Sequence, residues 1–256
     1  MAEARSAGFD APFHGAGSPA EGNADVAAVP NHAMNDPPAP DPDRRTPLAA
    51  ECRRCPALAA GRERICWGEG PDDAPLVVVG EAPAYGHPGA DRWRGGNWTG
   101  MAYSGRRSGR KIRGLIADLG YDAYYTNAVK CFPSAAYPAD RAGGRDPDAD
   151  PTDNREPTSG ERTNCRPYLR REIDRVGPDC VVATGRHATE SLLAVEDRRV
   201  DSFLEIVLDV QECPALGVSV LPLLHPSYQE VWVERLGYSP EQYRSAVGAA
   251  LAAVVD

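Results

Sequence analysis

The sequence lacks several features that would define a class of protein. It has no unbroken apolar run of membrane-spanning length, and its first residues lack the basic-then-apolar order of a signal peptide. It has only two lysines, Lys111 and Lys130, and its formal net charge is -9. The absence of such an apolar run and of a signal peptide argues against a membrane protein and predicts a cytoplasmic one. The acidic balance argues against binding of nucleic acid through bulk basicity.

One segment departs from this acidic balance. Between positions 92 and 113 there is no Asp or Glu, but there are seven cations: Arg92, Arg94, Arg106, Arg107, Arg110, Lys111 and Arg113. An acidic protein can therefore still carry a local phosphate-binding face. Charge alone fits a solvated Arg-rich loop and helix start equally well. Further along the chain, Lys130 is expected to contact phosphate or to be solvated.

Two polar segments set the domain limits. Residues 1–46 are rich in Ala, Pro, Gly and Asp and have no apolar period, which predicts a disordered acidic tail. Residues 134–164 are too long and too polar for an ordinary connection inside a domain, which predicts a flexible insertion. Residues 47–256 are otherwise expected to form one domain, and the protein is expected to be a monomer.

Short apolar runs alternate with helical patterns between these segments. Buried strands are predicted at Leu76–Gly80, Tyr124–Val129, Cys180–Thr184 and Val218–Leu223. Helices are predicted at Ser108–Leu119, Arg166–Val176, Arg186–Ala194 and about Pro240–Val255. The alternation predicts an α/β fold in three layers, α/β/α, with a four-stranded, mainly parallel sheet between helices.

Polar residues lie at or near the ends of three of these strands, at the carboxyl edge where α/β sheets bind ligands. Glu81 lies in GEAPAYG and would project a carboxylate into the crevice, although such a turn is a common strand exit. Asn127 offers a donor and an acceptor that match a planar base edge, or it caps backbone groups. His225 is held extended by Pro226, which favours a ring in the crevice, although a histidine after a strand is more often structural.

The chain has seven cysteines. Cys52 and Cys55 form a C-x-x-C pair, Cys131 follows the second predicted strand, and Cys165 precedes the next helix. In a cytoplasmic protein this set indicates metal or redox use rather than disulfides. Four thiolates hold either a tetrahedral zinc ion or a [4Fe–4S] cluster, and the spacing does not decide between them. The remaining cysteines are expected to be inert or part of the core: Cys66, Cys180 and Cys213.

Taken together, these motifs resemble the iron–sulfur uracil-DNA glycosylases of family 4. The resemblance covers most of the chain after Cys52 and rests on the order and spacing of CRRCPALAAGRERICWGEG, LVVVGEAP, TGMAYSG, YTNAVKC, CRPYL, VVATGRHATESLL and VLPLLHPSY. It implies the uracil-DNA glycosylase fold and a monofunctional DNA repair hydrolase. Such an enzyme flips uracil out of DNA, hydrolyses its N-glycosidic bond and leaves an abasic site.

The resemblance also implies roles for individual residues. Glu81 lies beside the position that places the attacking water, and His225 matches a histidine near the uracil O2. Tyr103 matches the aromatic residue that stacks on the flipped base, and Asn127 matches the amide that reads its edge. The implied ligands of a structural [4Fe–4S] cluster are Cys52, Cys55, Cys131 and Cys165. Contacts to DNA are expected from Arg106, Arg107, Arg110, Lys111 and Ser227.

Two features depart from the family pattern. The first motif continues as GEAPAYGHPGADRWRGGNWTG, without the usual acidic residues, so Tyr85 or His87 is expected to fill the space linked to thymine exclusion. The insertion separates the third and fourth cysteines, which a cluster tolerates because the cost of closing a loop rises slowly with length. After HPS, Tyr228 or Val231 is expected to wedge into the duplex.

Three alternatives remain open at this point. One is a glycosylase with altered or broader damaged-base specificity. Another is a non-catalytic iron–sulfur DNA-binding protein of the same fold, and the last is a zinc-binding module.

Overall fold

A five-stranded sheet organises residues 37–90 and 92–255, which the computed structural model describes. Its strand order is β2-β1-β3-β5-β4. The strands are β1 (Leu76–Gly80), β2 (Ala123–Asn127), β3 (Cys180–Thr184), β4 (Gln211–Cys213) and β5 (Val218–Leu223). All pairings are parallel except the antiparallel one between β4 and β5. The α/β fold is confirmed, but the strand count was one too low, because β4 has only three residues and leaves no apolar run.

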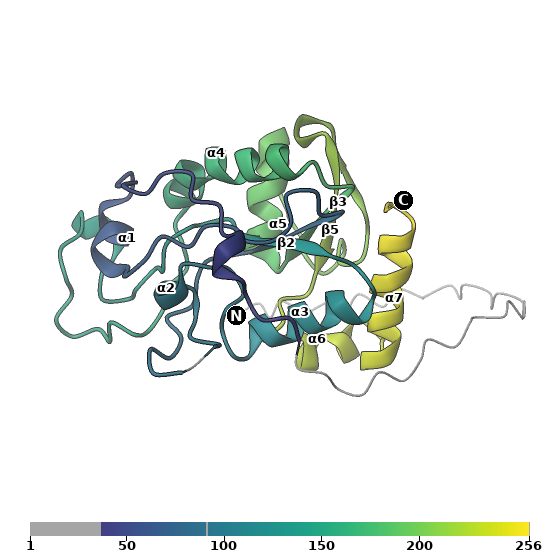
Figure 1. Cartoon of the computed structure of the whole chain (residues 1–256), viewed down its shortest axis with the longest axis horizontal. Coiled ribbons are helices and arrows are strands. Elements are labelled where there is room, and N and C mark those ends of the chain that lie inside the picture. The colour runs from purple at the N-terminus through teal and green to yellow at the C-terminus, as the bar shows by residue number, and fades with distance from the viewer. Residues whose placement is uncertain (1–36, 91, 256) are drawn as a thin grey trace, which may run out of the picture. The chain divides into compact units, whose positions relative to one another are not determined.

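Helices cover both faces of the sheet (Figure 1). One face packs against α3 (Ser108–Asp118), α6 (Gln229–Arg235) and α7 (Pro240–Ala252), and the other against α4 (Ser159–Val176) and α5 (Arg186–Leu193). The remaining helices are short: α1 (Pro56–Gly61), α2 (Gly96–Thr99), and the 3-10 turns η1 (Pro42–Arg44), η2 (Ala139–Arg141), η3 (Ala194–Glu196) and η4 (Pro214–Leu216). None of the described helices is both long and apolar enough to cross a bilayer.

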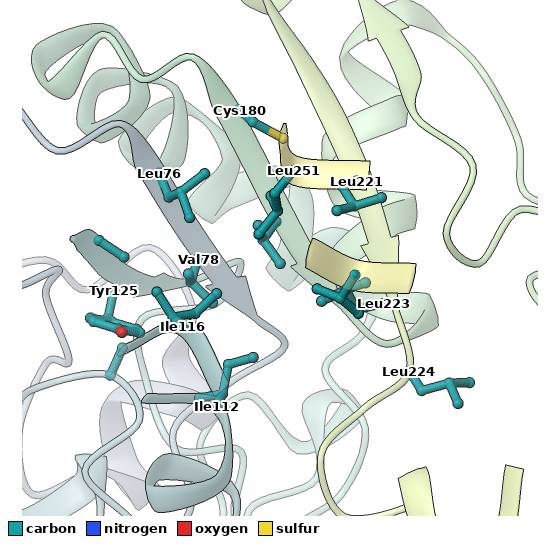
Figure 2. Close-up of a cluster of buried hydrophobic side chains, with 14 of the residues drawn as sticks. Leu76, Val78, Ile112, Ile116, Tyr125, Cys180, Leu221, Leu223, Leu224 and Leu251 are labelled. Atoms are coloured by element: carbon teal, nitrogen blue, oxygen red, sulfur yellow. The ribbon is translucent and has the colours of Figure 1, made fainter. Parts of the chain in front are cut away.

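Alternate residues of the strands build the two cores. Leu76 and Val78 of β1 pack with Ile112 and Ile116 of α3 and with Leu251 of α7, as Figure 2 shows. The intervening β1 residues, 77 and 79, belong to the core that faces α4 and α5. This two-residue period is the geometry of a strand buried on both faces. Each helix layer is therefore fixed by its own hydrophobic core.

Helix α4 begins seven residues before the predicted start at Arg166. Thr158 and Glu161 form a capping box there, and Arg155 binds Glu161 through two nitrogens at 2.8 and 2.7 Å. Because this first turn is polar, it carries no apolar period. The end of the predicted insertion is therefore helical, and Cys165 lies inside α4.

Hydrogen bonds to backbone carbonyls also cross the rest of that predicted insertion. The amide of Ala135 donates to the carbonyl of Asp153 at 2.8 Å, and the Ser134 hydroxyl donates to Pro151 at 2.9 Å. The segment between them is thus a loop whose ends are joined by hydrogen bonds, and its flexibility stays a prediction.

Part of the predicted tail, residues 37–46, lies within the described part of the chain. Residues 1–36 lie outside the described part of the chain, but the amide of Asp41 donates to Glu69 Oε1 at 3.0 Å. The amide of Thr46 donates to the carbonyl of Gly68 at 2.9 Å. Composition cannot indicate such a segment, because it is held through backbone groups and not through apolar side chains.

Candidate active site

A cavity of about 970 Å³ opens at the carboxyl ends of the parallel strands. The strand ends meet there because Gly80 of β1 is in register with Asn127 of β2, and Thr184 of β3 with Leu223 of β5. The four residues predicted for catalysis and base recognition all line this cavity: Glu81, Tyr103, Asn127 and His225.

A basic hollow of about 610 Å³ adjoins the cavity and shares three of its residues, Arg106, Arg107 and Ser227. Arg110 and Lys111 complete the set predicted to contact DNA. The structure thus brings all five together, at the start of α3 and just after His225. Within the hollow, Lys111 pairs with Glu230 at 2.5 Å, and Ser227 Oγ lies 2.8 Å from Ser108 Oγ.

Arg113 does not belong to this basic face, so the charge-based prediction was wrong for that residue. Its side chain is 2% exposed and forms an ion pair with Glu69 at 2.5 Å. It lies on the buried stripe of α3, together with Gly109, Ile112 and Ile116. That i, i+3, i+4, i+7 spacing is visible in the sequence and would have indicated its burial.

Asn127 is fixed at the end of β2 through its backbone and its amide. Lys130 Nζ donates to the Asn127 carbonyl at 2.6 Å and to Glu172 Oε2 at 2.5 Å. Lys130 is 1% exposed, so neither a phosphate contact nor a solvated role is correct. The Asn127 Nδ2 donates to Cys66 Sγ at 3.6 Å. Cys66, expected to be inert, thus contacts a site residue; burial raises its thiol pKa to about 12, which keeps it neutral.

Tyr103 is held in an unusual backbone conformation beside the cavity. Its φ is +48°, in the left-handed region that side chains other than glycine seldom adopt. Its Oη lies 2.5 Å from Thr184 Oγ1, which itself donates to the carbonyl of Val79. The phenol is therefore the donor of the pair, and it ties the ring to β3 and β1. A Cβ added at Gly80 would lie 2.9 Å from this oxygen and 2.5 Å from Asn127 Oδ1.

His225 follows β5 and is half-buried. The amide of Ser227 donates to its Nδ1 at 3.2 Å, so the neutral ring carries its proton on Nε2. Burial lowers the His225 pKa from its ordinary value, which favours this neutral form. A Cβ at Gly185 would lie 3.1 Å from His225 Cβ, so the histidine sits closely against the start of α5. The ring is left with one donor, its Nε2–H.

Glu81 has a raised pKa, because burial penalises its carboxylate more than nearby His187 stabilises it. His187, at the first turn of α5, also lines the cavity. Its Nε2 lies 3.4 Å from Glu156 and its Nδ1 lies 3.4 Å from Glu190. We did not predict His187 from the sequence, although it stands in TGRH at the same carboxyl edge.

Aromatic residues complete the wall of the cavity. Trp93, from the divergent first motif, lines it together with Phe203 and Trp232. Of the two residues expected in the thymine-excluding space, His87 lines the cavity. Tyr85 instead packs against Trp98 and Phe132, with ring centroids 5.4 and 5.5 Å away. Distant aromatics such as Phe203 carry no signal that would associate them with the first motif. The expected wedge residues, Tyr228 and Val231, are exposed.

The four cysteines predicted as ligands gather in one cluster with Leu58, Ile65, Trp67, Val129 and Tyr168. Three of their sulfurs accept hydrogen bonds from side chains: Arg62 to Cys131 at 3.1 Å, Asn164 to Cys55 at 3.4 Å and Tyr168 to Cys52 at 3.6 Å. Cys165 accepts one from the Lys130 backbone. Donors of this kind suit thiolate ligands. Within residues 37–90 and 92–255, no three ligating side chains converge at the spacing of a single ion.

The fold and site together define a three-layer α/β protein with a cavity at the carboxyl edge of its sheet, beside a basic surface and a cysteine cluster. The protein-family model described as Uracil DNA glycosylase superfamily matches residues 67–247 of the sequence. The chain therefore belongs to the uracil-DNA glycosylase superfamily.

Individual relatives are similar over most of their length. A type-4 uracil-DNA glycosylase of Thermotoga maritima is 30% identical over 184 residues, which cover 70% of this chain and 77% of that protein. The corresponding protein of Saccharolobus solfataricus is 27% identical, with 70% and 74% covered. A type-5 uracil-DNA glycosylase of Pyrobaculum aerophilum is 29% identical over 218 residues, with 72% and 82% covered.

Proposed function

We propose that this protein is a DNA repair glycosylase that hydrolyses the N-glycosidic bond of uracil in DNA and leaves an abasic site. The observation that carries the proposal is the convergence of Glu81, Tyr103, Asn127 and His225 on one cavity in a chain of this superfamily. The test is incubation with an oligonucleotide that contains one uracil, followed by measurement of free uracil and of strand cleavage by alkali.

Recognition begins with a base flipped out of the duplex. Tyr103 provides an aromatic platform for the flipped base, and Asn127 reads the edge that carries the uracil O4 and N3–H. Cytosine presents an amino group and an acceptor at the same places. Because Asn127 is 3% exposed and held by Cys66 and Lys130, it cannot rearrange freely. Cytosine would therefore leave hydrogen bonds unmade, which is the source of discrimination.

His225 stabilises the leaving base. As the N-glycosidic bond breaks, negative charge develops on uracil and positive charge on the sugar. A hydrogen-bond donor at O2 lowers the barrier, because it acts on charge that is larger in the transition state than in the substrate. The neutral ring, with its proton on Nε2, supplies this donor without placing a cation in the cavity before the reaction.

Glu81 acts on the water molecule that attacks the sugar. Its carboxylate orients the water toward the anomeric carbon and accepts a proton from it. Only the ionised form can act as this base, and burial makes that form less favourable than in an exposed glutamate. The phosphates on either side of the flipped nucleotide bind the basic hollow formed by Arg106, Arg107 and their neighbours.

Excision is expected to fall as the pH is lowered through the raised pKa of Glu81. The single-turnover rate should show an acid limb with an apparent pKa above 4.5, the ordinary value for glutamate. The lowered pKa of His225 keeps that ring neutral, so it should add no limb near 6.5. Glu81→Gln should be slower by about 100-fold or more and should lose the limb. The same acid limb in Glu81→Gln would show that another group is responsible.

The four clustered cysteines are proposed to hold a [4Fe–4S] cluster. The hydrogen bonds to their sulfurs and their shared apolar surroundings fit that donor set. When bound, the cluster supplies a structural cross-link between the segment before α1, the exit of β2 and α4, and no step of the reaction depends on it. Cys131 lies four residues after Asn127, so the cross-link also steadies the base-reading strand end.

Purified protein is expected to be brown and to contain about four iron atoms per chain. Cys131→Ser should lose most of the iron and the visible absorbance, and it should unfold at a lower temperature. The matched control is Cys213→Ser, a buried cysteine outside the cluster that should keep its iron. A colourless protein with one zinc per chain would refute the iron–sulfur assignment and support the zinc alternative.

A further inference from the structure

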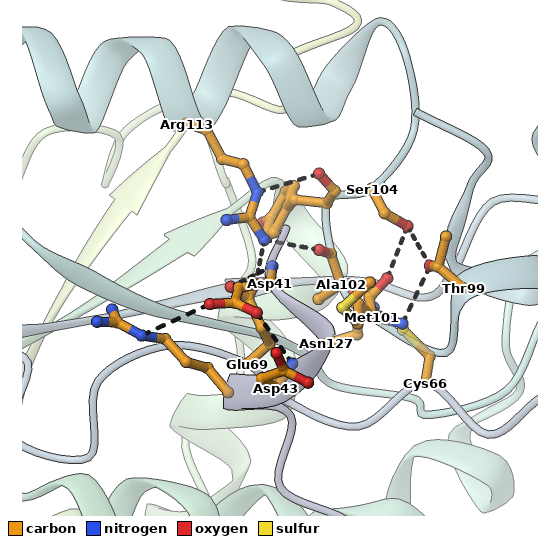
Figure 3. Close-up of polar contacts among 12 residues, drawn as sticks. Asp41, Asp43, Cys66, Glu69, Thr99, Met101, Ala102, Ser104, Arg113 and Asn127 are labelled. Atoms are coloured by element: carbon orange, nitrogen blue, oxygen red, sulfur yellow. Dashed lines mark hydrogen bonds and ion pairs between the residues drawn. The ribbon is translucent and has the colours of Figure 1, made fainter. Parts of the chain in front are cut away.

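Arg113 is a buried cation whose hydrogen bonds converge on the backbone that precedes and includes Tyr103. Its Nε donates to the carbonyl of Tyr103 at 3.2 Å, and its Nη2 donates to the carbonyl of Ala102 at 3.1 Å. Figure 3 shows the Arg113 guanidinium between the carbonyl of Ala102 and the carboxylate of Glu69. A planar fork with several donors can bind all three acceptors at once, which an ammonium group cannot do with the same geometry.

Glu69 orients this guanidinium from the other side. Its Oε2 accepts from Arg113 at 2.5 Å, and its Oε1 accepts from the amide of Asp41 at 3.0 Å. The guanidinium carbon also lies 3.9 Å from the centre of the Tyr125 ring, which in turn meets the Tyr103 ring edge to face at 5.9 Å. Arg113 is thereby fixed on several sides before it contacts the Tyr103 backbone.

Tyr103 requires such support. Its positive φ is unfavourable for a residue with a side chain, so surrounding contacts must hold it there. Helix α3 comes very close to this backbone: a Cβ at Gly109 would lie 2.1 Å from the Tyr103 carbonyl oxygen. The same carbonyl accepts from Arg113. The orientation of the Tyr103 ring in the cavity thus depends on the Tyr103 carbonyl, which Gly109 and Arg113 of α3 contact.

We propose that Arg113, with Glu69, is a positioning residue that holds Tyr103 in the orientation needed to stack on the flipped base. This inference rests on the proposed function, because it takes the base as the partner of Tyr103. Arg113 touches neither base nor phosphate in this role; it acts through the backbone of another residue. The ion pair thus contributes to excision as well as to the core.

The test is a pair of double-mutant cycles on single-turnover excision of uracil. Arg113→Lys keeps a cation opposite Glu69 but removes the planar fork. We expect it to slow excision by roughly 10- to 100-fold in the otherwise wild-type chain. In a Tyr103→Ala background its further effect should be less than about threefold, because the group it positions is gone. In an Asn127→Ala background the full loss should persist.

Melting temperatures separate this role from a structural one. The shift caused by Arg113→Lys should be the same with and without Tyr103, while its effect on excision should differ. If Arg113→Lys reduced excision by the same factor in the otherwise wild-type chain and in the Tyr103→Ala background, the inference would be overturned. A wild-type rate in Arg113→Lys would also overturn it. If Arg113→Lys does not fold, Glu69→Gln enters the same cycles with the same criteria. Wild-type protein without excision would overturn the proposed function and this inference together; excision with additive losses would overturn this inference alone.

Discussion

His225→Ala is expected to slow single-turnover excision of uracil by roughly 100- to 1000-fold, the loss typical of one donor to a developing oxyanion. The structure gives His225 a single free donor, because the Ser227 amide occupies Nδ1 and burial keeps the ring neutral. Alanine removes that donor and leaves the rest of the cavity in place. The measurement is the rate of uracil release with enzyme in excess over a labelled oligonucleotide.

Two controls show whether the loss is chemical. Affinity for the abasic product strand should stay within a few-fold of the wild type, because the basic hollow is unchanged. His225→Gln, which retains an N–H donor, should be faster than His225→Ala. A rate for His225→Ala within threefold of the wild type would remove His225 from the mechanism.

Gly80→Ala is expected to reduce excision by about 100-fold or more, because it displaces the two residues that hold the base. The added Cβ would lie 2.5 Å from Asn127 Oδ1 and 2.9 Å from Tyr103 Oη. Neither side chain can move easily, because Asn127 is buried and hydrogen-bonded to Cys66, and Tyr103 is hydrogen-bonded to Thr184. The loss should appear in excision and in inhibition by free uracil, which both need the intact pocket.

Gly114→Ala is the matched control for this substitution. Gly114 lies in α3, and its added Cβ would make only an ordinary contact at 3.7 Å with Pro37. Alanine in a helix interior is favoured over glycine by about 0.5–1 kcal/mol, so the control should be as stable as the wild type or slightly more so. Wild-type excision by Gly80→Ala would mean that the side chains of Asn127 and Tyr103 are more mobile than the structure indicates.

Much of the sheet could be predicted from the sequence. The strands β1, β3 and β5 were predicted with their observed bounds, because each is a short, mainly apolar run; β1 and β3 are buried throughout, and β5 is buried from Val220 onward. The carboxyl edge followed from the parallel topology, and it brought Glu81, Asn127 and His225 into one cavity. Local pattern was enough here, because each of these residues ends a strand or follows one within two positions.

The remaining errors concern polar groups whose partners are distant in sequence. Lys130 pairs with Glu172, and Arg113 pairs with Glu69; in each case the partner is more than 40 positions away. A charge pattern does not distinguish a buried, paired cation from one that faces solvent. The early start of α4 has a different cause: a capping box and an ion pair between residues close in sequence stabilise it without an apolar period. Side-chain hydrogen bonds and ion pairs thus stabilise the features that the charge pattern and the apolar runs did not predict.

Release of free uracil is the measurement that tests the central claim most directly. Otherwise identical oligonucleotides with uracil, cytosine or thymine at one position would be incubated with brown, iron-loaded protein and assayed for free base and for alkali-labile sites. The account predicts free uracil in amounts equal to the abasic sites formed, and no cytosine. Intact uracil-containing strands after incubation with protein that has its full iron content would contradict it.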